Sequence, residues 1–193
     1  MVIISYSIEA TLKKIFCTMN KPEVWLRGPV ENIPSLLQPV AHAILQAREE
    51  VNALMKNFPE EKLWEKPSNV ASVGFHLLHL RGVLERLFNY AKGNLLSEQQ
   101  LNELKQETQP HDITVEQLVK NFDEQVDKAL KQLSETPENT LLDKRGVGRA
   151  QLPSNVLGLL FHAAEHTMRH TGQLLVTARI LMNQDEEKIF EVL

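Results

Sequence analysis

The sequence predicts an all-α protein, a four-helix bundle with one short extra helix. Apolar residues recur at intervals of three and four over several long stretches, as they do along the buried face of a helix. The Pro and Asn residues that interrupt helices fall between these stretches rather than inside them. No stretch shows the strict alternation of a half-buried strand, so four principal helices of similar length are expected to pack as a bundle.

The first long helix is expected to follow Pro34, with Ser35 as its N-cap, and to end near Phe58-Pro59. Its apolar residues repeat at helical spacing, which predicts one buried face. This stripe consists of Leu37, Val40, Ala41, Ile44, Ala47, Val51 and Leu54.

The second long helix is expected to follow the segment "KPSNV" and to run to about Tyr90. Ser68 or Asn69 can accept hydrogen bonds from its first free amides, and Gly93-Asn94 would end it. Its buried stripe consists of Val73, Leu77, Leu80, Leu84 and Leu87.

A short helix and a third long helix come next. In "LSEQQLNELKQETQPHD", Ser97 and Gln100 have the spacing of a capping box, and Pro110 stops the helix. Its polar composition predicts a position on the surface. The third long helix is expected to begin with Thr114 as its cap and to end at "TPENT", with Leu118, Phe122, Val126, Leu130 and Leu133 on its apolar face.

Residues 136 to about 153 are expected to form a plain connection. Gly146 and Gly148 occur there without the Gly-Lys-Ser/Thr of a phosphate-binding loop. The last long helix would begin at Ser154 or Asn155 and continue to about Met182. The segments "PSNVASVGFH" and "PSNVLGLLFH", at 67–76 and 153–162, share six of ten positions, which suggests that the second and fourth helices begin with the same cap chemistry, although coincidence is an equal alternative.

The length of 193 residues suits a single domain. We expect an N-terminal extension over residues 1–29, the helical bundle over 30–183 and a C-terminal tail over 184–193. The start of the chain is expected to be neither a signal peptide nor a membrane span, because Glu9 interrupts its apolar run and Lys13 and Lys14 follow rather than precede it.

The charge of the chain indicates which partners to expect, and its cysteine content indicates the cellular compartment. With 21 basic and 25 acidic residues, the formal net charge of −4 argues against a surface built to bind nucleic acid. The single cysteine, Cys17, cannot form an internal disulfide, so a reducing compartment is expected, by default the cytoplasm. No membrane partner is expected.

The stretch "LLFHAAEHTMRHTGQLL" places His162, His166 and His170 four residues apart. Residues at this spacing lie one helical turn above each other, about 5–6 Å between Cβ atoms, so an adjacent pair can approach one metal ion. His162 and His170 are two turns apart and too distant to share it comfortably. The apolar stripe through Leu159 and Leu174 includes His166 and His170, which are therefore the preferred pair, with His162 at the rim.

Two imidazoles leave a divalent site incomplete, so a facing helix must supply another ligand. The second helix offers "FHLLHLRG", with His76 and His79. The apolar spacing of the second helix favours His79 over His76 only weakly. When residues 67–76 are aligned with 153–162, His76 corresponds to His162, which suggests that both lie at helix edges. The alternative is that these histidines are ordinary hydrogen-bonded residues of a structural bundle without a metal.

The segments "SVGFHLLHLRGVLE" and "LFHAAEHTMRHTGQLL" together resemble the DinB/YfiT-like superfamily of metal-dependent helical proteins, over about residues 30 to 183. The resemblance implies that His79 joins His166 and His170 at one divalent metal ion, nickel or zinc, and it is this resemblance that favours His79 over His76. The matching residues around the ligands are Ser72, Val73, Leu80, Gly172 and Gln173.

Three neutral imidazoles leave an open coordination position for a substrate. The resemblance implies a metal-dependent enzyme, of which thiol S-transferases using a low-molecular-weight thiol are one kind, because coordination to a divalent cation deprotonates a thiol. It also suggests a homodimer. A different class of function is a noncatalytic ligand-binding or stress-response module on the same bundle.

Other polar residues are weaker candidates. Glu165 and Gln173 flank the histidines and could orient ligands or substrate, although an exposed position is expected for Glu165. Arg145 and Arg149 could hold an anionic substrate, but solvated loop charges are the simpler expectation. Two remaining histidines are expected to be structural, one on the first helix and one in a loop: His42 and His111.

Overall fold

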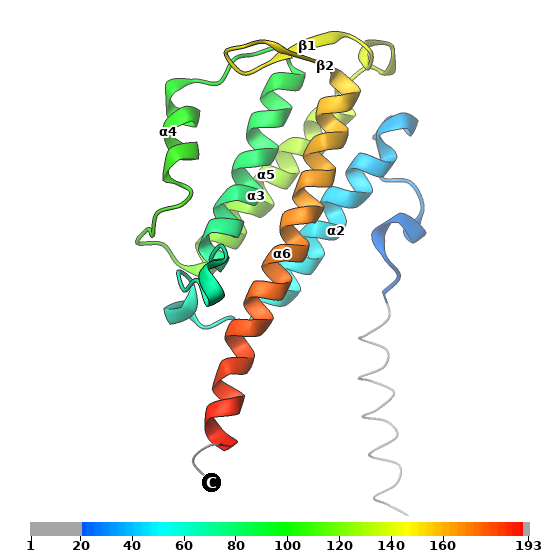
Figure 1. Ribbon diagram of the computed structural model, residues 1–193. Helices are drawn as coiled ribbons and strands as arrows, with labels where there is room; N and C mark the ends of the chain where they lie inside the picture. Colours follow the sequence, from blue (N-terminus) through cyan, green and yellow to red (C-terminus); the bar gives the residue numbers. More distant parts are fainter. Residues whose placement is uncertain (1–20, 191–193) are drawn as a thin grey trace, which may run out of the picture.

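The computed structural model describes the backbone of residues 21–190 and the side chains of residues 21–182. Four long helices form the bundle, and the predicted all-α class is confirmed (Figure 1). A short helix and a two-stranded antiparallel sheet accompany them. The long helices are α2 (Gln38–Met55), α3 (Val73–Ala91), α5 (Val115–Ser134) and α6 (Val156–Phe190), the short one is α4 (Glu98–Gln106), and the strands are β1 (Lys144–Val147) and β2 (Leu152–Asn155).

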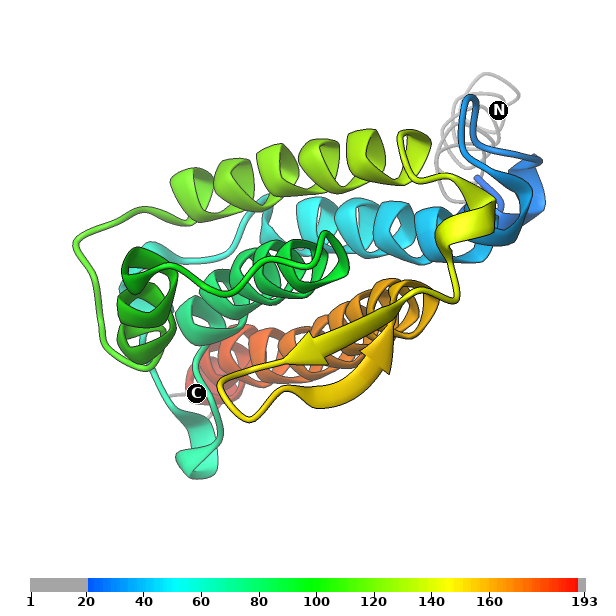
Figure 2. The same ribbon diagram turned by 90° about the horizontal axis from the view of Figure 1, so that it is seen from above.

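Each long helix packs against two others. Helix α6 contacts α3 and α2, and α5 contacts the same two helices from the other side, so the four surround a common core. Helix α4 lies outside this ring beside α3, and the hairpin of β1 and β2 crosses one end of α3 and α6 (Figures 1 and 2). Large side chains that the bundle buries completely include Ile44, Leu77, Leu80, Leu84, Phe122, Leu160 and Leu174.

Two of the predicted helix starts are confirmed by their caps. The hydroxyl of Ser97 accepts from the backbone N–H of Gln100, and Oε1 of Gln100 accepts from the backbone N–H of Ser97. The hydroxyl of Thr114 accepts from the backbone N–H of Gln117 at the start of α5. Both caps join residues that are three positions apart, so the sequence alone is enough to predict them.

The predicted cap of the first long helix is wrong. Ser35 opens a short 3₁₀ turn, Ser35–Leu37, and α2 follows it without a side-chain cap. The chain enters the helix through the tighter turn because successive i to i+3 hydrogen bonds, beginning with the Leu37 N–H to the Pro34 carbonyl, already satisfy its first amides.

The cap of α3 differs from the prediction, whereas α6 begins at one of the two predicted residues. Ser68 and Asn69 lie in a separate turn with positive φ, and the cap of α3 is Ser72, whose hydroxyl accepts from the backbone N–H of Phe75 at 3.2 Å. At α6 the cap is Asn155, whose Oδ1 accepts from the N–H of Gly158 at 2.6 Å. The two similar segments therefore do not share cap chemistry, because the first forms a turn before its helix and the second forms strand β2.

The hairpin of β1 and β2 replaces the plain connection that the sequence predicted. Lys144 pairs with Asn155 and Val147 pairs with Leu152. Each strand has only four residues, and all are exposed or half-buried, so no alternating apolar pattern marks them. A turn with Gly148 at φ 67° joins them.

Helix α6 extends to Phe190, beyond the predicted end near Met182, because neither Pro nor Gly follows that residue. The limits proposed for the N-terminal extension, the bundle domain and the tail stay predictions. Within the described part of the chain, no helix combines the length and apolar character needed to cross a membrane.

Candidate metal centre

Helices α3 and α6 run side by side and carry the histidines that the sequence singled out (Figure 1). The Ser72 cap fixes the start of α3, which places His76 and His79 in its first two turns. His166 and His170 lie one turn apart along the middle of α6. The facing surfaces of the two helices therefore bring four imidazoles together.

Three of these imidazoles converge. One nitrogen from each of His79, His166 and His170 lies within 4.8 Å of the other two. The Nε2 atoms of His79 and His166 are 3.0 Å apart, and the ring centroids of His79 and His170 are 4.3 Å apart. All three rings are half-buried, so the cluster is neither sealed in the core nor fully solvated.

The spacing fits a metal ion. Zn²⁺ binds imidazole nitrogen at about 2.0–2.1 Å, so two ligands of a tetrahedral site are separated by roughly 3.3 Å. The separation of 3.0 Å between the Nε2 atoms of His79 and His166 is close to that value. Among the described residues, no side chain or backbone group hydrogen-bonds the buried Nδ1 of His166. This cluster could therefore hold a metal ion.

A carboxylate orients the first of these rings. Glu107 Oε2 lies 2.7 Å from Nδ1 of His79, and Nη1 of Arg86 donates to the other oxygen of Glu107 at 2.5 Å. Glu107 and Arg86 are only 5% and 8% exposed. A carboxylate at Nδ1 favours the tautomer that carries its proton there and leaves the Nε2 lone pair for a ligand bond, the arrangement usual for a metal-binding histidine.

The sequence was compared with known families and proteins. The family described as the DinB superfamily matches residues 43–174, which include all the histidines of the cluster together with Arg86 and Glu107. The chain belongs to the DinB superfamily. The search of curated proteins finds no match.

The fourth imidazole of this DinB bundle is His76, and the prediction that it lies at a helix edge is wrong. His76 is 3% exposed, and its Nδ1 lies 3.2 Å from Nδ1 of His170. Burial lowers the pKa of His76 to about 4, so the ring is neutral at pH 7 and can accept the Nδ1 proton of His170. His76 therefore orients His170 as Glu107 orients His79.

Two of the three converging rings, those of His166 and His170, have lowered pKa values. Burial, followed by the neighbouring imidazole of His79, lowers the pKa of His170 to about 4. The same two causes lower the pKa of His166. A neutral imidazole keeps the lone pair that a metal requires, so His166 and His170 could act as metal ligands at neutral pH.

His162 occupies the rim, as its position in the sequence suggested. Its side chain is 52% exposed, and Nδ1 lies 3.4 Å from a carboxylate oxygen of Glu165. Glu165 is half-buried rather than exposed and also pairs with Arg169, and this hydrogen bond lowers the pKa of its carboxyl. His162, Glu165 and His166 form a second, more open group of possible ligands.

The other candidates contribute elsewhere. Arg145 donates from Nε to the carbonyl of Ala91 at 2.8 Å, so it caps the end of α3. Nε2 of His42 lies 3.1 Å from the Gly28 carbonyl oxygen, and Nε2 of His111 lies 2.9 Å from that of Gln106. The remaining two candidates, Arg149 and Gln173, are exposed.

Sequence reasoning missed Glu107 and Arg86. The short helix was expected on the surface because of its polar composition, yet Glu107, at its end, reaches into the bundle. One signal was available: Gly82 stands in the middle of α3, where glycine is unfavourable. A Cβ at Gly82 would collide with Glu107 Oε1 and Arg86 Nη1, so this glycine makes room for the carboxylate behind His79.

Proposed function

We propose that His79, His166 and His170 bind one divalent metal ion and that this DinB protein is a metal-dependent enzyme. The observation that carries the proposal is the pairing of Glu107 with Nδ1 of His79, 2.7 Å apart, while Nε2 of the same ring lies 3.0 Å from Nε2 of His166. A histidine held in the core for packing alone has no need of a buried carboxylate that selects its tautomer.

Neighbouring residues hold the candidate ligand rings in position before an ion binds. Glu107 favours the proton on Nδ1 of His79, and the hydrogen bond from Arg86 keeps the Glu107 carboxylate in place. His76 fixes the ring of His170 through their Nδ1 atoms. Phe75 stacks on His79 with centroids 5.3 Å apart and restricts rotation of that ring. Ordered ligands lose little conformational freedom when they bind an ion.

We propose nickel or zinc as the ion, because both accept imidazole nitrogen readily. When bound by three neutral imidazoles, such an ion has an open position and supplies Lewis acidity to a small-molecule ligand. The proposed cosubstrate is a low-molecular-weight thiol, which makes the proposed reaction an S-transfer. Cys17 lies outside the described residues, and the thiol is expected to arrive with the cosubstrate. The cytoplasm and a homodimer remain predictions of this proposal.

Metal content is the direct test. Elemental analysis of the purified protein should give one nickel or zinc ion per chain, and His166→Ala should remove it. His162→Ala is the matched control, because His162 is one turn away on the same helix but exposed. It should retain the metal. A wild-type protein without stoichiometric metal, even after incubation with nickel or zinc, would contradict the proposal.

Turnover separates an enzyme from a binding module. The metal-loaded protein should transfer a low-molecular-weight thiol to an electrophile in a screen of several thiols and electrophiles, and His79→Ala should abolish the reaction. If the loaded protein binds thiols without turnover, the site is a noncatalytic ligand-binding module and the enzymatic half of the proposal is wrong.

A further inference from the structure

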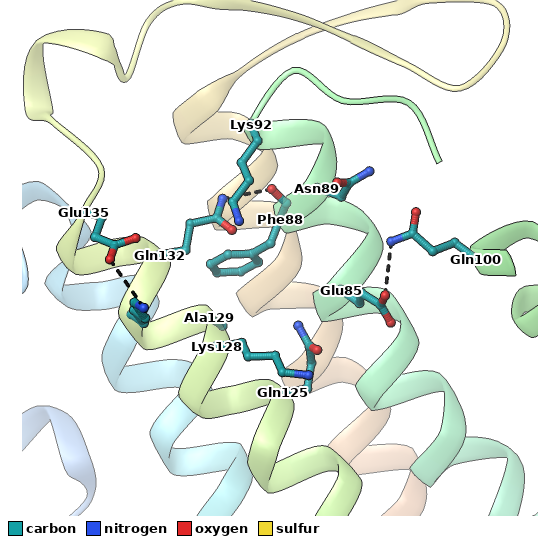
Figure 3. A pocket seen from close by; sticks show the side chains of 11 residues that line it. Glu85, Phe88, Asn89, Lys92, Gln100, Gln125, Lys128, Ala129, Gln132 and Glu135 are labelled. Carbon is teal, nitrogen blue, oxygen red and sulfur yellow. Dashed lines mark hydrogen bonds and ion pairs between the residues drawn. The ribbon is translucent and has the colours of Figure 1, made fainter. Parts of the chain in front are cut away.

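A pocket lies between α3 and α5, away from the histidine cluster on α3 and α6, with α4 at its edge (Figure 3). Its volume is about 370 Å³, within the range of roughly 300–1,000 Å³ that small-molecule sites occupy. None of its lining residues belongs to the histidine cluster. We call it the α3–α5 pocket, and the residues that carry the argument are Phe88, Lys92, Gln125, Lys128 and Gln132.

Gln125 is the unusual residue of this pocket. Its side chain is 6% exposed, yet no group in the described part of the chain hydrogen-bonds its amide. The amide faces the pocket from α5 (Figure 3). The amide of Gln132, two turns further along α5, shows the ordinary case, because it donates to the carbonyl of Phe88 at 2.9 Å. Because this amide has no partner among the described residues and lies on the wall of the pocket, it is available to hydrogen-bond a ligand.

Two lysines bring positive charge to the same pocket. Lys92 follows the last turn of α3, and Lys128 lies on α5 one turn before Gln132 (Figure 3). Across residues 21–182, neither amino group has an acidic partner. Lysine amino groups bind carboxylates and phosphates as point charges.

The two acidic residues of the pocket, Glu85 and Glu135, each have a cationic partner other than Lys92 and Lys128. Glu85 pairs with Arg81 at 3.0 Å and also accepts a hydrogen bond from Gln100 at 3.1 Å. Glu135 lies 3.9 Å from Lys131. Because these carboxylates have cationic neighbours of their own, the charges of Lys92 and Lys128 remain available to a ligand.

We infer that the α3–α5 pocket binds a small organic anion that carries a carboxylate or phosphate group. Lys92 and Lys128 attract the anionic group, and Gln125 forms the hydrogen bond that its amide lacks within the protein. Phe88 supplies an apolar wall for the remainder of the molecule. The site is separate from the proposed metal centre and does not depend on the metal.

Calorimetric titration of the full chain tests this inference. Inorganic phosphate and succinate serve as probes, at low ionic strength because salt screens the exposed lysines. We expect saturable binding of at least one probe. Gln125→Leu and Lys128→Gln should each weaken it about tenfold, equal to about 1.4 kcal/mol. Lys120→Gln is the matched control, since Lys120 is exposed on the same helix outside the pocket, and it should leave affinity unchanged.

The two probes distinguish the kinds of ligand. Binding of phosphate alone indicates a phosphorylated ligand, and binding of succinate alone indicates a carboxylate; either supports the inference when the two pocket variants weaken it. Saturation by neither probe overturns the inference. So does an equal loss of affinity in Lys120→Gln, or wild-type affinity in both pocket variants that thermal melting shows to be folded.

Discussion

At the scale of single residues, the candidate metal centre depends on partners that hold the imidazoles in one tautomer. The Nδ1 atom of His79 meets Glu107 at 2.7 Å, and that of His170 meets His76 at 3.2 Å. With the proton on Nδ1, Nε2 is the nitrogen of each ring that keeps a lone pair for an ion. The residues behind the ligands therefore decide whether three histidines act as one site.

Replacing Glu107 tests this dependence. Glu107→Gln preserves the size of the side chain but removes the charge that favours the proton on Nδ1 of His79. We expect metal affinity to fall about 10- to 100-fold. Competition with a chelator measures the change. Glu98→Gln, an exposed residue of the same helix, should leave affinity at the wild-type level, and equal affinities for all three proteins would show that Glu107 has no orienting role.

Gln125 offers a second test at this scale. Gln125→Leu should leave the free energy of unfolding of the ligand-free protein within about 0.5 kcal/mol of the wild type, because the amide that it removes has no protein partner and faces the pocket. Gln132→Leu should lower it by about 1 kcal/mol, because it removes the donor to the Phe88 carbonyl. Urea denaturation measures both. A loss of stability in Gln125→Leu would show that this amide is structural.

At the scale of elements, α4 positions Glu107, which supports the candidate metal centre. This short helix packs against α3 outside the bundle, and Glu107 at its end enters the space that Gly82 leaves open. The capping box at Ser97 fixes where the helix begins and therefore where Glu107 falls. An element that looks peripheral thus contributes to the site through its last turn.

Adding one methyl group to α3 tests this relation. Gly82→Ala favours the helix by about 1 kcal/mol in isolation, but its Cβ would displace Glu107 and Arg86. We expect metal affinity to fall about tenfold, measured by chelator competition. Gly172→Ala in α6 is the matched control, because nothing lies within 4 Å of its added Cβ. It should raise thermal stability and keep the metal, and an equal affinity in Gly82→Ala would contradict this account of α4.

At the scale of the whole molecule, folding buries several imidazoles in the neutral form. The pKa values of His76 and His170 fall to about 4 in the folded protein, from the usual 6.5. The unfolded chain therefore binds more protons than the folded one between these two values. The cost of burying these rings depends on pH, although the bundle around them does not change.

The metal-free protein should accordingly lose stability in acid. The free energy of unfolding should be highest above about pH 6.5 and should decrease as the pH falls toward 4, because protonation favours the unfolded state over this window. Urea denaturation in the presence of a chelator measures the slope. His76→Gln should reduce the slope, whereas His111→Gln, an exposed residue, should not. Stability that stays constant from pH 6.5 to 4.5 would contradict the low pKa values.

The sequence by itself determined the helical class and the principal helices, because apolar spacing and short-range caps such as Ser97 and Thr114 act within a few residues of the chain. It also gave His79, His166 and His170 as candidates, through a resemblance to a family. It could not give the hairpin, whose strands have no buried face and so leave no periodic signal. It could not single out the cap at Ser72 either, because Ser68 and Asn69 offer the same cap chemistry a few residues earlier.

Only the tertiary structure decided what surrounds the candidate ligands. Glu107 lies 28 residues from His79 in the chain, and the packing of α4 on α3 brings it both to His79 and to Arg86. His76 is buried where α3 faces α6, and the packing of α5 on α3 places Gln125 on the wall of the α3–α5 pocket. Burial and hydrogen bonding between distant segments depend on how helices are placed in space, and local sequence patterns do not encode that placement.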